Sequence, residues 1–369
     1  MSAGTFFKTF NSSDRTTTRT LLHEAIPVTG TLVKGTYDTS EQSDGEVREK
    51  NIKTFSHGMF MSIYDYPHLS SSANHIFDIT AGFSKNDDSD YADTTVQQDK
   101  KANIYAQMAQ VLAGYDTSGN VRDFDVDGDL SGDGGEKIHN AIFLNFSRLL
   151  VKDEIKKGSF SMIVGVGDNP ATPFLGTNAT KTISDAGAES SYKVNSPAGE
   201  YGILKEGSKQ VGLIYYQAGI VVLNIGREGS TSANTVFDYR NGNGTHWTDT
   251  NNTGDELRDV VRGGSINLIA DGLRSRIKSI SFNNTTELNS TIYFCRASHN
   301  EFNYSSNPTY LDGSKIRVKN GQVLASPRAY VTTVGLYSAD NELLATAKLS
   351  EPLRKDPTNE LTLRVRLDY

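Results

Sequence analysis

The stretch Leu361-Thr-Leu-Arg-Val-Arg-Leu367 alternates strictly between apolar and polar residues. Successive side chains of a strand point to opposite faces, so this alternation puts the four apolar side chains on one face and the threonine and two arginines on the other. A strand of this kind fits an antiparallel sheet that is covered on one side. The stretch therefore predicts that the chain ends in antiparallel β-structure.

The same kind of signal recurs upstream. Further strands are expected at residues 277–283, 290–296, 315–318, 330–337 and 343–349. Ala339-Asp-Asn-Glu342 is a turn signal that would join the last two into a hairpin. Thirty-three glycines, together with many Asn, Ser and Thr, indicate numerous turns. The predicted fold class is mainly β with a few helices (α+β), in antiparallel β-sandwich-like modules.

The clearest helix is predicted at residues 97–113, where apolar side chains recur at three- and four-residue steps. Residues 141–155 fit either a helix or a buried strand. Short helices are expected near 254–261 and 266–276. The predicted domains are an extended N-terminal arm (1–50), a central β-rich domain with one helix near 97–113 (51–276), and a C-terminal antiparallel β module (277–369).

Composition argues against several classes of protein. The 369 residues carry a net charge of −7 and no long basic run, which argues against nucleic acid or an anionic membrane surface as partner. No apolar run approaches the about 18 residues of a membrane span, and the N-terminus lacks a signal-peptide pattern. The single Cys295 excludes an internal disulfide and a cysteine-based zinc site. A soluble protein is expected.

Catalytic signatures are poor. The seven histidines are scattered, and the chain contains no His-Glu-X-X-His, no Gly-X-Ser-X-Gly and no phosphate-binding Gly-X-X-X-X-Gly-Lys-Ser/Thr motif. Acidic pairs such as Asp153 and Glu154 would serve a glycosidase only if the fold brought two carboxyl groups together. The expectation is a protein that is not an enzyme and has no catalytic residues.

The sharpest local motif is Asp123-Phe-Asp-Val-Asp-Gly-Asp-Leu130. Aspartates at alternate positions followed by glycine match the start of an EF-hand-like calcium loop, with Asp123, Asp125, Asp127 and Asp129 as candidate ligands. Counted from Asp123, however, the twelfth position is a glycine, and Glu136 comes two residues too late. A solvated acidic turn is the favoured alternative, so no cofactor is expected apart from a possible calcium ion.

A polar and aromatic segment, residues 296–310, follows an apolar strand. It fits a binding loop, or a loop ordered by its own hydrogen bonds at a subunit interface. The second interpretation is favoured because aromatic and arginine side chains are typical interface anchors. The candidate interface residues are Arg296, Phe302, Tyr304, Tyr310, Tyr337 and Tyr369.

Longer motifs carry a resemblance. They are Phe55-Ser-His-Gly-Met-Phe60, Phe143-Leu-Asn-Phe-Ser-Arg-Leu-Leu150, Phe302-Asn-Tyr-Ser-Ser-Asn-Pro-Thr-Tyr310, Tyr330-Val-Thr-Thr-Val-Gly-Leu-Tyr337 and Arg364-Val-Arg-Leu-Asp-Tyr369. Together they resemble virion structural proteins of marine contractile-tailed phages, especially cyanophages. Thr333-Val-Gly-Leu-Tyr337 with Leu344-Ala-Thr-Ala347 is also similar to attachment modules of tail-fibre and baseplate proteins.

The resemblance implies a structural subunit of a tailed-phage virion, assembled in the host cytoplasm. It would be tail-associated, in the baseplate or fibre-attachment region, and would act through protein–protein contacts. Its partners would be other virion proteins and further copies of itself. Alternatives are a neck, collar or capsid-associated protein, and a receptor-binding or glycan-binding tail protein.

Overall fold

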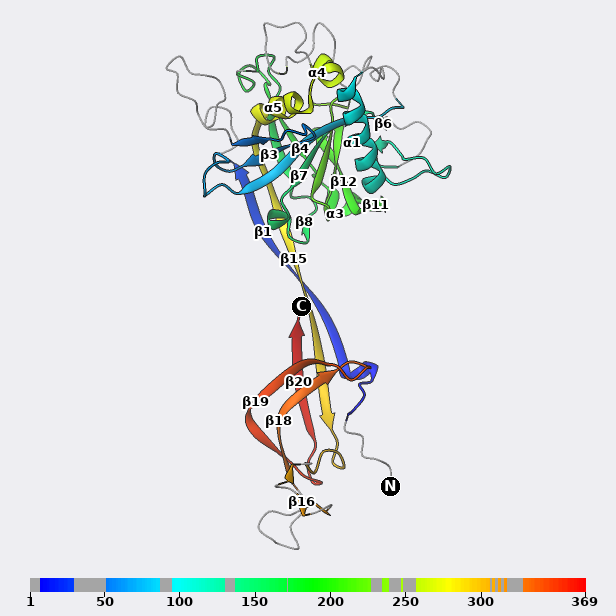
Figure 1. Cartoon of the computed structure of the whole chain (residues 1–369), viewed down its shortest axis with the longest axis vertical. Coiled ribbons are helices and arrows are strands. Elements are labelled where there is room, and N and C mark those ends of the chain that lie inside the picture. The colour runs from blue at the N-terminus through cyan, green and yellow to red at the C-terminus, as the bar shows by residue number, and fades with distance from the viewer. Residues whose placement is uncertain are drawn as a thin grey trace. The chain divides into compact units, whose positions relative to one another are not determined.

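The computed structural model describes residues 7–29, 51–86, 95–129, 137–170, 172–226, 234–238, 247, 257–305, 307–308, 311–312, 315–316 and 328–369. It is mainly β, with 46% strand and 17% helix, and its large sheets are antiparallel, which confirms the predicted fold class. The chain divides into two compact units (Figure 1). Unit 1 consists of residues Met1–Leu21 and Glu287–Tyr369, and unit 2 of Leu22–Thr286. The three predicted domains stay a prediction.

Unit 2 is built on antiparallel strands, and most of them belong to one sheet. The strands within unit 2 are β2 (Ile52–Thr54), β3 (Met61–Tyr64), β4 (His75–Phe83), β5 (Phe124–Asp125), β6 (Lys137–Ile138), β7 (Asn140–Phe146), β8 (Glu154–Ile155), β9 (Ser161–Gly165), β10 (Thr180–Ser184), β11 (Lys193–Ser196), β12 (Gly199–Glu206), β13 (Lys209–Tyr215) and β14 (Ile220–Asn224). Its helices are α1 (Val96–Leu112), α2 (Arg148–Val151), α3 (Ala188–Ser191), α4 (Leu257–Gly263) and α5 (Ile266–Arg276). β1 (Arg15–Thr29) and β15 (Ile277–Ala297) contribute residues to both units.

Strand β7 shows how the sheet of unit 2 is buried on both faces. Ile142 and Leu144 belong to one hydrophobic cluster, whereas Ala141 and Phe143 belong to a second. The first cluster also contains side chains of β9, β10 and β15, so the sheet curves around it. The second lies under α1 and beside β5 and β6. Residues 141–155 form β7, the short α2 and β8. Their sequence fits either a helix or a strand because a strand that is buried on both faces shows no alternation of apolar and polar residues.

The predicted helix at 97–113 is confirmed as α1. Its N-terminus is capped by Thr95, whose side chain accepts a hydrogen bond from the Gln98 backbone N–H at 3.2 Å. The helix packs directly on β4, and a Cβ atom at Gly82 would lie 2.6 Å from the Lys101 carbonyl oxygen. Only glycine allows this approach of helix to strand. The two shorter predicted helices are confirmed as α4 and α5.

Residues 277–297 form one strand, β15, rather than the two predicted strands. The polar residues between the predicted strands continue the ladder, because buried Asn284 and Thr285 pair with β8. The Asn284 side chain donates to the Leu150 carbonyl at 2.9 Å, and its Oδ1 accepts from the Glu24 N–H at 3.2 Å. Hydrogen bonds therefore hold the strand where apolar periodicity fails.

Unit 1 contains the 3₁₀ turn η1 (Ser12–Asp14) and the strands β16 (Leu311–Asp312), β17 (Lys315–Ile316), β18 (Ala329–Tyr337), β19 (Leu343–Lys355) and β20 (Leu361–Asp368). β18 and β19 form the predicted hairpin, with Asn341 in the turn at φ +61°. β20 pairs with the last part of β15, from Ser290 opposite Asp368 to Ala297 opposite Leu361. None of the helices in the described part of the chain is long and apolar enough to cross a membrane.

Candidate interaction surface

Unit 1 buries very few apolar side chains. Among its described residues, only Ala329 and Leu336 are buried hydrophobics, and every member of both hydrophobic clusters lies in unit 2. A folded domain normally has one contiguous core in which each buried side chain touches many others. The described strands of unit 1 therefore lack the apolar burial that usually stabilises a β-domain.

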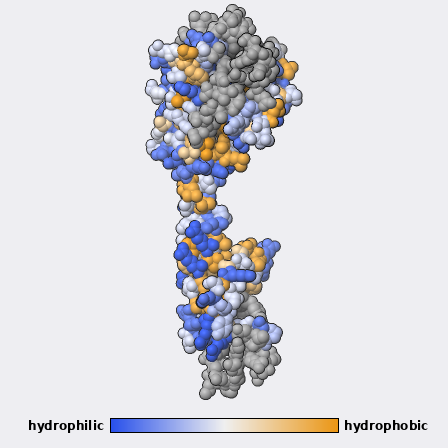
Figure 2. Space-filling model, turned by 90° about the vertical axis from the view of Figure 1, so that its left-hand side faces the viewer, coloured by the Kyte–Doolittle hydropathy of each residue, from blue (hydrophilic) through white to orange (hydrophobic). Residues whose placement is uncertain are grey.

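Large apolar side chains of unit 1 are instead at its surface, where Figure 2 shows them interspersed with polar ones. The β18–β19 hairpin alone exposes Tyr330, Tyr337, Leu343 and Leu344, the last at 67%. The alternation predicted for β20 is confirmed, yet its four apolar side chains are only half-buried. The chain thus covers this apolar strand face only in part.

The hairpin is also short of strand partners. Among the described residues, no third strand pairs with β18 or β19, which form a two-stranded sheet of their own. A single two-stranded hairpin is at best marginally stable in water, because it cannot bury enough apolar surface. Ala329 and Leu336 of β18 are buried, so unit 1 covers the hairpin only in part.

The structure places the predicted interface residues in unit 1, at separate points. The Arg296 side chain is more than half exposed, and its Nε lies 3.4 Å from Asp14 Oδ1. Tyr337 is exposed and meets the edge of the Phe7 ring, with centroids 5.1 Å apart. Tyr369 is exposed, and its hydroxyl is 3.1 Å from Thr291 Oγ1. Tyr310 lies outside the described residues.

These residues do not form one compact patch. Arg296 pairs with Thr362 at one end of the β15–β20 ladder, whereas Tyr369 follows β20 opposite Asn289 at the other end. Seven residues of strand at about 3.3 Å each separate the two ends by roughly 23 Å. Because an odd number of residues separates them, Arg296 and Tyr369 also point to opposite faces of the ladder. The candidate surface is therefore spread over unit 1 and is not a single face.

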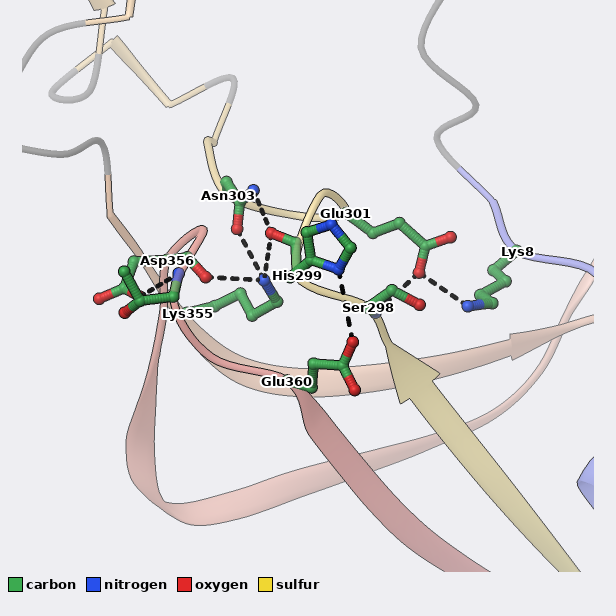
Figure 3. A network of polar contacts seen from close by, with 9 residues as sticks. Lys8, Ser298, His299, Glu301, Asn303, Lys355, Asp356 and Glu360 are labelled. Carbon is green, nitrogen blue, oxygen red and sulfur yellow. Dashed lines mark hydrogen bonds and ion pairs between the residues drawn. The ribbon is translucent and has the colours of Figure 1, made fainter.

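Phe302 and Tyr304, both exposed, stand on a loop that a polar network holds in place (Figure 3). At its centre is the fully buried Lys355, whose Nζ donates to the His299 carbonyl at 3.3 Å, to Asn303 Oδ1 at 2.7 Å and to the Asp356 carbonyl at 3.0 Å. Oxygen atoms thus surround the ammonium group and offset its loss of water.

The rest of the network ties the loop to its surroundings. Glu301 accepts hydrogen bonds from Lys8 Nζ at 2.7 Å and from the Ser298 N–H at 2.9 Å, and these bonds lower its pKa. His299 Nδ1 lies 3.5 Å from Glu360 Oε1. Hydrogen bonds from Thr358, together with Arg354, lower the pKa of Asp356 to about 2.

Within this frame Phe302 has φ +53°, a conformation that is uncommon for a bulky residue. The bonds on both sides of it overcome that strain. The loop therefore presents an aromatic ring to solvent from a fixed backbone.

Sequence reasoning missed several exposed apolar residues of unit 1. They are Phe7, Phe10, Leu21, Leu288, Tyr330, Leu343 and Leu344. Phe10 packs against Tyr293 with ring centroids 5.4 Å apart, so the N-terminal segment belongs to this surface. The sequence signal for these residues is the adjacent pair Leu343 and Leu344. Neighbouring residues of a strand point to opposite faces, so each face of β19 carries one leucine.

In the acidic loop of unit 2, three of the four predicted calcium ligands lie together and the fourth does not. Asp125, Asp127 and Asp129 each offer an oxygen within 4.8 Å of the others. Asp123 is engaged elsewhere, since its carboxylate accepts from Ser84 Oγ at 2.6 Å and from Asn86 Nδ2 at 2.9 Å.

Comparison of the chain with protein-family models, with curated proteins and with solved structures gave no match.

Proposed function

We propose that the chain is a structural subunit of a tailed-phage virion, and that it works by assembly rather than by chemistry. One observation carries the assembly part: unit 1 is a β-unit whose described residues bury two apolar side chains and expose many large ones. Fully burying an exposed leucine or phenylalanine stabilises a protein by about 1.5–3 kcal/mol. The virion part rests on the resemblance of the sequence motifs.

The partner that we propose for unit 1 is a further copy of the chain. Copies related by a rotation axis offer identical faces, so a face that is apolar in one copy is apolar in all. The β18–β19 hairpin fits such an arrangement, because Tyr330, Tyr337, Leu343 and Leu344 are exposed in one chain. Neighbouring copies would then form together the core that a single unit 1 lacks.

The first test is the mass of the full-length chain over a range of concentrations. One chain weighs 40.3 kDa, and we expect a concentration-dependent shift to a fixed multiple of that mass. Light scattering after size-exclusion chromatography measures it directly. A chain that stays at the single-chain mass at high micromolar concentration would contradict assembly from identical copies.

The place in the particle is tested by an electron-microscopy map of the intact virion. We propose the tail, in the baseplate or fibre-attachment region, so threefold or sixfold density for this chain near the tail tip is expected. Density at the neck, collar or capsid would overturn the tail location. Absence of the chain from purified particles would overturn the virion assignment altogether.

A further inference from the structure

The acidic loop begins at the short β5–β6 pair, which is part of the core of unit 2. Asp125 pairs with Lys137 in this ladder, and the neighbouring Phe124, Val126 and Ile138 belong to the second hydrophobic cluster. The start of the loop is therefore anchored by apolar packing.

Hydrogen bonds hold the turn that follows. Gly128 has φ +71°, which glycine adopts without strain. Its carbonyl accepts from the Tyr201 hydroxyl at 3.0 Å and from Asn195 Nδ2 at 3.1 Å. The Asp129 N–H donates to Asp127 Oδ1 at 3.2 Å. The backbone that carries the three carboxylates is thus fixed by the chain itself.

One carboxylate oxygen of Asp125 has no hydrogen-bond donor among the described residues. Asp125 is fully buried, and its Oδ2 accepts from Lys137 Nζ at 3.0 Å. Its Oδ1 is also buried, and no residue in the described part of the chain gives it a hydrogen bond. A buried carboxylate oxygen without a partner is costly, and a bound ion is one of the few explanations for it.

The geometry points to calcium, and we propose that Asp125, Asp127 and Asp129 bind one Ca²⁺ ion, which takes up Oδ1 of Asp125. The ligands are hard carboxylate oxygens, which calcium prefers. Calcium–oxygen bonds of about 2.4 Å allow two ligands of one ion to lie up to about 4.8 Å apart, and the three oxygens fall within 4.8 Å of one another. This site is independent of the assembly proposed for unit 1.

Terbium luminescence on the full-length chain tests the site, because Tb³⁺ replaces Ca²⁺ and is excited through nearby tyrosines such as Tyr201. We expect saturable emission that CaCl₂ displaces, with a Kd for calcium of about 10⁻⁴ M or tighter. MgCl₂ should compete more weakly, because Mg²⁺ demands stricter geometry and gives up its water reluctantly. Emission that does not saturate, or that CaCl₂ fails to displace, would overturn the proposal.

Two variants and a matched control locate the ion. Asp127→Asn keeps an oxygen for the Asp129 N–H but removes a charged ligand, so we expect calcium affinity to fall at least ~10-fold. Asp129→Asn should do the same and serves as the second variant if the first fails to fold. Asp123→Asn is the control, since Asp123 binds Ser84 and Asn86, and it should retain the affinity of the wild type. Loss of binding in the control alone, with both variants unaffected, would place the ion elsewhere and refute the site.

Discussion

Replacing Leu344 by aspartate is expected to dissociate the assembled chain while unit 2 remains folded. Leu344 is 67% exposed in β19, so the substitution should change the stability of an isolated chain by no more than about 0.5 kcal/mol. In an assembly that buries the hairpin, the same carboxylate would lose its water without gaining a partner, at a cost of several kcal/mol. We therefore expect self-association to weaken at least ~100-fold.

The matched control is Leu69→Asp, which changes a leucine of similar exposure, 74%, in unit 2. It introduces the same charge and should leave association unchanged. Sedimentation equilibrium of the two variants and the wild type gives the comparison. Equal association constants for Leu344→Asp and the wild type would show that the hairpin is not part of the contact.

The second large effect is expected for Lys101→Met, within unit 2. Lys101 is fully buried in α1, and its Nζ donates to the carbonyls of Val261, Arg262 and Gly264 at the end of α4. Methionine fills a similar volume but leaves these acceptors without their donor, which should lower the free energy of unfolding by about 2–4 kcal/mol at neutral pH.

Urea unfolding followed by tryptophan fluorescence measures this loss in unit 2 specifically. Trp247 is the only tryptophan of the chain, is fully buried, and donates from Nε1 to the Ile269 carbonyl at 3.0 Å. The control is Lys100→Met, because Lys100 makes an exposed hydrogen bond to the His57 carbonyl and should contribute less than about 1 kcal/mol. Similar losses in the two variants would contradict the role assigned to Lys101.

The same lysine predicts a pH dependence. Burial lowers the pKa of Lys101 to about 8 from its ordinary value of 10.5. Between these pH values the unfolded chain binds more protons at this group than the folded chain, so stability rises with pH. The wild type should gain up to about 3 kcal/mol over Lys101→Met from pH 8 to 10.5. A constant difference across that range would show that the lysine keeps its ordinary pKa in the folded chain.

Periodic segments of the fold could be predicted from the sequence, and polar ones could not. The alternation of 361–367 and the helical spacing of 97–113 each match one element, β20 and α1. β15 was divided in two because its middle is held by hydrogen bonds of Asn284 and Thr285, which leave no periodic mark. Trp247 is completely buried against Ile269, and this burial depends on tertiary contacts that no local pattern encodes.

The candidate surface was only partly predictable for a similar reason. Alternation in β20 shows which face is apolar, but whether the chain itself covers that face depends on the packing of distant strands. For the acidic loop, the match to a calcium-binding loop depends on which aspartate is counted as the first ligand. Asp125 rather than Asp123 begins the cluster in the structure, and the twelfth residue counted from Asp125 is Glu136, the type of residue that ends an EF-hand loop.

Amide hydrogen exchange over a series of chain concentrations tests most directly whether unit 1 is completed by further copies. Exchange reports local opening, so an incompletely packed sheet exchanges faster than a buried one. Protection of residues 329–337 and 343–355 is predicted to rise with concentration, while that of β7 and β13 in unit 2 stays constant. Full protection of the hairpin at concentrations where the chain is a single copy would contradict the completion of unit 1 by further copies.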